Sequence, residues 1–166
     1  IVGFGTVGSG IYKILSSEVD SHPILKEIEI AKIAVKDLNK KRDIELDNNL
    51  LTDDPFKLIN DPSIDVIVEV MGGVDLAKDI ILQSLKLGKS VVTANKAVIA
   101  RYGEEIYKTA SKEGVYILSE AAVCGGIPII EPLKRSLKSN SIKKMVGIIN
   151  GTTNFILSKM TNEKAD

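Results

Sequence analysis

Three glycines near the start of the chain have the spacing of a phosphate-binding turn. The motif GxGxxG consists of Gly3, Phe4, Gly5, Thr6, Val7 and Gly8. The first glycine permits a tight turn, the second lets a pyrophosphate approach the backbone, and the third lets a helix pack closely on a strand. The start of a following helix would offer free N–H groups and a positive dipole to the phosphates. The motif is weak evidence by itself, but its place between an apolar strand and a helical pattern favours a dinucleotide site.

The residue after the second expected strand bears on the choice of cofactor. An acidic residue there would bind the ribose hydroxyls of NAD. This chain has Lys36 at that point, followed by Asp37 and by a basic stretch at 40–42. A lysine could meet a 2′-phosphate, so we expect a preference for NADP. Asp37 leaves NAD open, and a solvated loop of mixed charge is the alternative interpretation.

Lys96 follows the apolar run 91–93 and is our candidate catalytic residue. The carboxyl end of a parallel strand is where α/β sheets bind ligands. A lysine that loses water beside a cofactor can release its proton and act as a proton carrier. We expect Lys96 and Gly72 to contact the cofactor as well. An exposed loop lysine is the alternative.

A glycine-rich elbow after Glu120 could hold a cation. One carboxylate followed by free main-chain oxygens supplies oxygen ligands, and with a single acidic side chain the site would suit a monovalent ion. A glutamate that caps a helix is the alternative. Cys124 in this elbow is interpreted as a small packed residue and His22 as a surface residue, because neither has a catalytic partner nearby in sequence.

The segment 150–154, Asn-Gly-Thr-Thr-Asn, joins an expected strand to an expected helix. Its threonine hydroxyls and free N–H groups could bind a small polar substrate. Plain helix capping by Thr152 or Thr153 is the alternative.

The elements that must position these residues alternate between short apolar runs and helical patterns, which predicts an α/β fold with a mainly parallel sheet. Expected strands cover 1–4, 28–35, 66–70, 91–93, 115–119 and 142–149. Helices are expected from about 7 to 15, from Asp54-Pro55 to Asp61-Pro62, and over 75–87, 104–113, 130–138 and 153–160, with Gly88 as a left-handed C-cap. The stretch 36–49 is predicted to be a loop.

Composition excludes several classes of function. The 166 residues are 44% hydrophobic and 27% charged with no net charge, so nothing indicates a nucleic-acid or membrane partner. A single cysteine and the lack of an apolar run of about 20 residues predict a cytoplasmic protein. The chain starts inside an apolar strand without a methionine, so we expect residues ahead of Ile1.

Taken together, the segments VGFGTVGSG, VVTANKAVIA, SEAAVCGGIPII and GIINGTTNFIL resemble the homoserine dehydrogenase family. They come in the family's order, with similar spacing, and span essentially the whole chain. The resemblance implies a Rossmann-type, doubly wound parallel sheet over 1–128. The first elements of an α+β catalytic and dimerisation domain would follow over 129–166. The family's later signature, with an acidic pair and a second lysine, would lie beyond Asp166, so we expect this chain alone to be inactive.

The resemblance also implies an activity and ligands. The family reversibly oxidises homoserine to aspartate 4-semialdehyde with NAD or NADP, in threonine, methionine and isoleucine biosynthesis, and the complete protein is expected to be a homodimer. Lys96 matches a lysine between nicotinamide and substrate, and Gly151 and Thr152 match substrate contacts. The positions that match a sodium-like site are Glu120, Val123, Gly125 and Ile127, the last three through main-chain oxygens.

Two rival interpretations stay open. A sugar-type oxidoreductase would also carry a lysine just past a Rossmann strand, but usually as Glu-Lys-Pro where this chain has Asn-Lys-Ala. A non-catalytic nucleotide-binding module would use only the glycine motif.

Overall fold

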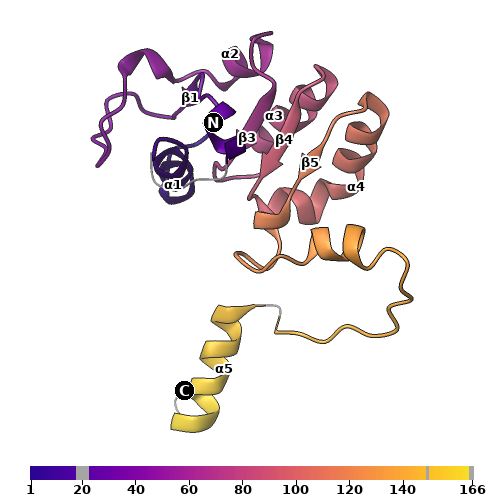
Figure 1. Cartoon of the computed structure of the whole chain (residues 1–166). Helices are drawn as coiled ribbons and strands as arrows, with labels where there is room; N and C mark the ends of the chain where they lie inside the picture. Colours follow the sequence, from indigo (N-terminus) through magenta and orange to yellow (C-terminus); the bar gives the residue numbers. More distant parts are fainter. Residues whose placement is uncertain (18–22, 149, 165–166) are drawn as a thin grey trace.

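The computed structural model describes residues 1–17, 23–148 and 150–164, and its strands all run parallel (Figure 1). The strands are β1 (Ile33–Ala34), β2 (Leu51–Thr52), β3 (Val66–Glu69), β4 (Ser90–Thr93) and β5 (Ile117–Leu118). Val2 makes parallel bridges to Ala34 and to Glu69, which joins the β1–β2 pair to the β3–β4–β5 group. The order across the sheet is therefore β2, β1, Val2, β3, β4, β5. After Val2, the chain adds β1 and β2 on one side of it and then β3, β4 and β5 on the other. Val2 therefore marks the point where the strand order reverses, which is where such sheets bind ligands.

Five α-helices connect or follow the strands in the described part of the chain. They are α1 (Thr6–Leu15), α2 (Pro55–Asn60), α3 (Asp75–Lys86), α4 (Lys96–Glu113) and α5 (Gly151–Glu163). Shorter helical turns lie at η1 (Pro23–Glu27), η2 (Asn48–Leu50), η3 (Glu120–Ala122) and η4 (Pro132–Ser136, a π-helix). None of the helices in the described ranges has the length and apolar character that crossing a membrane requires.

The helix ends follow the chemistry that the sequence predicts. The Asp54 carboxylate accepts from the N–H of Phe56 at 2.9 Å, and Pro55 occupies the first helical position of α2. Gly88 and Gly114 follow α3 and α4 with φ of +76° and +69°, the left-handed region that glycine enters without steric cost. These caps fix where each helix stops, and so where the next strand begins.

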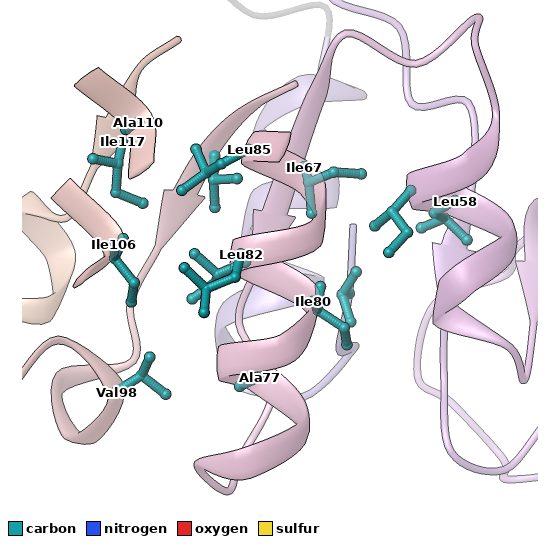
Figure 2. Close-up of a cluster of buried hydrophobic side chains, with 14 of the residues drawn as sticks. Leu58, Ile67, Ala77, Ile80, Leu82, Leu85, Val98, Ile106, Ala110 and Ile117 are labelled. Carbon is teal, nitrogen blue, oxygen red and sulfur yellow. The ribbon is translucent and has the colours of Figure 1, made fainter. Parts of the chain in front are cut away.

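The larger core lies between one face of the sheet and helices α2, α3 and α4. Alternate strand residues point to this face because a strand has a period of two, so Ile67 and Val91 face the same helices as Ile117. Figure 2 shows Ile80 and Leu85 of α3 and Ile106 of α4 in one cluster with the strand residues Ile67 and Ile117. This packing fixes α3 and α4 against the strands β3 and β4, whose carboxyl ends precede the candidate residues.

The opposite face of the sheet is covered by α1. Ile1, Ile33 and Val35 are buried there, and the Phe4 ring meets the Tyr12 ring edge-on at 5.8 Å. Helices on both faces make the sheet doubly wound, as the sequence predicts. The expected apolar side of α1 is only partly buried, however: Val7 is 50% exposed and Ile14 is 60% exposed.

Several predicted strands are shorter than expected. The first is reduced to the bridge at Val2, and the predicted strand 28–35 keeps only β1, because its early residues lie beside no neighbouring strand. The run 115–119 keeps only Ile117–Leu118. The sequence also misses β2 and η1, since a two-residue strand and a five-residue turn leave almost no periodic signal.

The helices and the last predicted strand also differ from expectation. α4 begins at Lys96 rather than near Glu104, because Asn95 caps it through its side chain. The predicted strand 142–149 is wrong over its described residues, 142–148, which form no strand and have no strand beside them. α5 begins at Gly151, two residues earlier than expected. His22 lies outside the described residues.

Candidate functional site

The glycine motif forms the turn between Val2 and α1. The surroundings of its three glycines differ, and so does the effect of adding a side chain at each. Gly3 has φ of +100°, and a Cβ there would lie 2.8 Å from the Val70 carbonyl oxygen. A Cβ on Gly8 would lie 2.3 Å from the Gly3 carbonyl oxygen, so Gly8 allows α1 to pack on the turn. At Gly5 a Cβ would meet nothing within 4 Å. The structure therefore needs Gly3 and Gly8 for the fold, whereas Gly5 faces open space.

The start of α1 is open to a ligand. Gly5 is the N-cap residue, and no side chain caps the helix. The first N–H groups of a helix have no partner inside it, and they carry the positive end of the helix dipole. Gly5, Thr6 and Val7 are exposed, whereas Phe4 is half-buried against Tyr12. This arrangement has the features of an anion-binding helix N-terminus.

Lys36 lies two residues beyond β1 and is exposed at the carboxyl edge of the sheet. The loop that follows is held by Arg42, whose guanidinium donates to the carbonyl oxygens of Asp37 at 2.6 Å and Lys40 at 2.8 Å. The Asp37 carboxylate accepts from the N–H of Asn39 at 2.9 Å. Arg42 and Asp37 are thus engaged in shaping the loop, and Lys36 is the basic side chain left beside the strand end.

Lys96 is the first residue of α4, three positions after β4 ends at Thr93. Its side chain is exposed and makes no hydrogen bond or ion pair in the described part of the chain. The preceding residue ties this turn to its neighbours, because the Asn95 amide donates to the carbonyl oxygen of Gly73 at 2.8 Å. Met71, the first residue of the segment 71–73, lies against Gly3. The glycine turn, the segment after β3 and the turn that carries Lys96 are therefore adjacent.

Glu69 is a functional candidate that the sequence analysis missed. It ends β3, is fully buried, and accepts hydrogen bonds from the Thr93 hydroxyl at 2.5 Å and the Met71 N–H at 3.0 Å. Burial raises the pKa of Glu69, although hydrogen bonds from Thr93, Met71 and Asn95 oppose the shift. The missed signal was an acidic residue inside the apolar run 66–70, since a buried carboxylate must find partners.

The Glu120 carboxylate holds the start of the next helical segment. It accepts from the backbone N–H groups of Ile129, Ile130 at 2.9 Å and Glu131 at 3.0 Å. Burial raises the pKa of Glu120, but these three hydrogen bonds outweigh that effect and leave the pKa below its ordinary value. The helix-capping alternative thus describes what this side chain does here. No group of three or more acidic, histidine or cysteine side chains suited to a metal occurs in the described ranges.

The main-chain oxygens of the elbow are nevertheless free. None of the hydrogen bonds in the described part of the chain ends on the carbonyl oxygen of Val123, Gly125 or Ile127. Cys124 and Gly125 both have left-handed φ, +58° and +59°. A carboxylate offers about four acceptor positions, of which Glu120 uses three. The elbow can therefore supply oxygen ligands to a monovalent cation.

The two expected substrate contacts lie away from the glycine turn and Lys96. Gly151 and Thr152 are exposed at the start of α5, which stands apart from the sheet in Figure 1. Asn150 caps this helix by accepting from the Thr153 N–H at 2.8 Å, so the alternative of capping by Thr152 or Thr153 is wrong. Gly72 is exposed beside Gly73 in the segment after β3, near the glycine turn.

The parallel strand order, the doubly wound helices and the open glycine turn define a Rossmann-type nucleotide-binding domain. Comparison with known families goes further. Residues 3–120 match the NAD-binding domain of homoserine dehydrogenase, and residues 128–166 match the family described simply as homoserine dehydrogenase. The chain belongs to the homoserine dehydrogenase family.

Individual relatives agree with this assignment. A homoserine dehydrogenase from Synechocystis sp. is 53% identical over 166 residues, which cover 100% of this chain and 38% of the relative. A solved homoserine dehydrogenase from Thiobacillus denitrificans is 43% identical with a TM-score of 0.87, covering 99% of this chain and 38% of that one. A hyperthermophilic archaeal homoserine dehydrogenase in complex with NADPH is 33% identical with a TM-score of 0.60, and the match covers 68% of this chain and 35% of that one. The chain therefore spans little more than a third of these relatives.

Proposed function

We propose that this chain is the cofactor-binding part of an enzyme that interconverts homoserine and aspartate 4-semialdehyde, with NAD or NADP as the hydride carrier. The observation that carries the proposal is the open glycine turn at the uncapped start of α1. The segment 71–73 links this turn to the one that carries Lys96. The cofactor would accept a hydride from the alcohol carbon of homoserine. The protein's part is to bind, to orient and to handle the proton.

The residues present fit a dinucleotide. The space over Gly5 would admit a pyrophosphate next to the backbone, and the N–H groups that begin α1 would donate to it. Lys36 stands at the end of β1, where the ribose of the adenosine half would lie in this fold, so we propose that it meets a 2′-phosphate and favours NADP. The archaeal relative solved with NADPH supports this preference. Phe4, Thr6, Val7 and Gly72 complete the proposed cofactor surface.

Lys96 is the proposed proton carrier. Its exposed amine lies on the first turn of α4, just past the carboxyl end of β4, and forms no ion pair or hydrogen bond with any of the described residues. It would donate a hydrogen bond to the substrate oxygen and take the hydroxyl proton during oxidation. Gly151 and Thr152 would bind the substrate, which requires that the start of α5 face Lys96 in the complete protein.

Further parts of the proposal concern the complete protein. We propose a monovalent cation, sodium in particular, on the carboxylate of Glu120 and the main-chain oxygens of Val123, Gly125 and Ile127. We also propose a domain boundary at about residue 128, a homodimer, a cytoplasmic location and a role in threonine, methionine and isoleucine biosynthesis.

The test uses this chain joined to the remaining part of the Synechocystis relative, with homoserine-dependent formation of NADPH as the assay. Lys96→Ala is expected to lower kcat by about 100- to 10,000-fold, the usual worth of general acid–base help. Lys112→Ala, an exposed lysine at the far end of the same helix, is the matched control and should leave kcat unchanged. If Lys96→Ala is as active as the control, the proposed site is wrong.

Lys96→Arg separates two roles of this side chain. Arginine keeps the charge and the donors but does not release a proton at neutral pH. An inactive Lys96→Arg variant supports proton transfer, whereas a variant that restores most of the activity shows that Lys96 acts by charge and position.

A further inference from the structure

A buried carboxylate lies directly beneath the turn that carries Lys96. Glu69 is fully buried at the end of β3, and none of the ion pairs in the described part of the chain involves it. Its partners are uncharged: the Thr93 hydroxyl, the Met71 N–H and, at 3.4 Å, the Asn95 amide. Burying a carboxylate without a cation is costly even with such partners. The position therefore needs an explanation beyond packing, since an apolar side chain would fill it at lower cost.

Thr93 links Glu69 to the candidate site by hydrogen bonds. The backbone N–H of Asn95 donates to the Thr93 hydroxyl oxygen at 3.0 Å, so Glu69 orients the group that holds Asn95. The Asn95 side chain accepts from the Val98 N–H at 3.2 Å and caps α4. Its amide donates to the carbonyl oxygens of Met71 and Gly73 at 3.4 and 2.8 Å.

The same carboxylate thus links the glycine-turn side of the proposed site to the side that carries Lys96. On one side it fixes the Met71 N–H, in the segment that packs under Gly3 of the glycine turn. On the other side it fixes Thr93 and Asn95, the two residues that set the direction of the first turn of α4. The Lys96 side chain makes no hydrogen bond or ion pair with the residues that the structure describes, so its position depends on that turn.

We propose that Glu69 is a positioning residue of the site: through Thr93 and Asn95 it fixes the start of α4, and with it Lys96, against the segment 71–73. The inference rests on the proposed function, because it assigns Glu69 to the geometry of the same proton carrier. Glu69 itself is fully buried and acts only through these neighbours.

The test compares four variants in this chain joined to the remaining part of the Synechocystis relative. Glu69→Ala removes the carboxylate, and Thr93→Val removes the hydroxyl while keeping the shape of the side chain. Glu69→Gln keeps an acceptor for Met71 and can donate to the Thr93 oxygen, so it is the conservative rescue. Ile67→Val, a fully buried position on the same strand and face, loses packing without touching the network.

A displacement of a reacting group by about 1 Å can cost on the order of 100-fold in rate. We therefore expect Glu69→Ala and Thr93→Val to lower kcat by about that factor, with a much smaller change in the Kd for NADPH. Glu69→Gln should recover most of the lost kcat. In the 166-residue chain, amide hydrogen exchange at Val98 should accelerate in Glu69→Ala and Thr93→Val but not in Ile67→Val.

The outcomes separate this inference from the proposed function. If Lys96→Ala lowers kcat but Thr93→Val and Glu69→Ala behave like Ile67→Val, the positioning role is wrong and the proposed function stands. If Lys96→Ala leaves kcat unchanged, the proposed function fails whatever the Glu69 variants do. Should Glu69→Ala not fold, Thr93→Val and Glu69→Gln still decide: full activity in Thr93→Val overturns the proposal.

Discussion

Replacing Gly5 by valine should weaken cofactor binding without harming the fold. A Cβ at Gly5 meets nothing within 4 Å, and the backbone there is extended, with φ of −88°. Valine adopts such a conformation without strain. A side chain on the N-cap would instead occupy the space through which a pyrophosphate must reach the N–H groups of α1. The expected defect is therefore in binding, and the free energy of unfolding should change by less than about 1 kcal/mol.

The size of the binding defect follows from the hydrogen bonds that are lost. A hydrogen bond to a charged group is worth about 1.5–3 kcal/mol. Moving the pyrophosphate away from one N–H donor should thus raise the Kd for NADPH by about 10- to 100-fold, at about 1.4 kcal/mol for each factor of ten. Titration of the 166-residue chain with NADPH, followed by the fluorescence of the reduced nicotinamide, measures this change directly.

Two other glycines in the same segment provide controls. Gly10 also has open space around a built Cβ but lies inside α1, so Gly10→Ala should keep the Kd and add about 0.5–1 kcal/mol of stability. Gly8→Ala would place its Cβ 2.3 Å from the Gly3 carbonyl oxygen, and relieving that overlap should cost about 1–3 kcal/mol of stability. If Gly5→Val binds NADPH as tightly as Gly10→Ala does, the pyrophosphate does not approach this turn.

Three further predictions use the same chain. Lys36→Ala should raise the Kd for NADPH more than the Kd for NADH, and added salt should shrink the difference; equal losses for both would argue against a 2′-phosphate contact. Burial raises the pKa of Glu69 above its ordinary value of 4.5, so the stability that its protonated form contributes is complete below pH 4.5 and is lost as the pH rises through the folded pKa. Glu69→Gln does not titrate, and urea unfolding at several pH values should show wild type losing stability relative to it as the pH rises; a constant difference would contradict the shift. If the loop after Glu120 binds sodium, the unfolding temperature should be higher in sodium chloride than in choline chloride at equal ionic strength; identical thermal unfolding curves in the two salts would contradict the proposed cation.

The sequence predicts best those features that depend on a few adjacent residues. The roles of Gly3 and Gly8 follow from their spacing and from close backbone approaches that any GxGxxG turn makes. The start of α2 follows from Asp54-Pro55 in the same way. Such local signals survive because no distant part of the chain is needed to complete them.

The features that the sequence misses depend on contacts between distant elements. Glu69 stands out only when β3, β4 and α4 are packed together, since its partner Thr93 is 24 residues away. The early start of α4 depends on the Asn95 cap, which also bonds to Gly73 across 22 residues. The predicted strand at 142–148 fails for a related reason: an apolar run forms a strand only beside another strand, and the described chain provides none there.

The two halves of the proposed site therefore have different physical requirements. The cofactor side is assembled from backbone within one sheet, where Gly3 packs on the segment 71–73 and Asn95 bonds to the same segment, so its geometry is set by the core beneath it. The substrate side depends on Gly151 and Thr152, on a helix whose described residues are all exposed and whose apolar side chains contact no core. Phe155 and Leu157 on this helix are 65% and 57% exposed, which is unfavourable for large apolar groups unless another surface covers them. Under the proposed function, cofactor affinity measured on this chain reports on the half of the site that the sheet assembles, whereas turnover would also require a surface that covers α5. A variant that raises the Kd for NADPH therefore acts at the glycine turn, and one that lowers kcat with little change in that Kd acts at Lys96 or at the network of Glu69, Thr93 and Asn95.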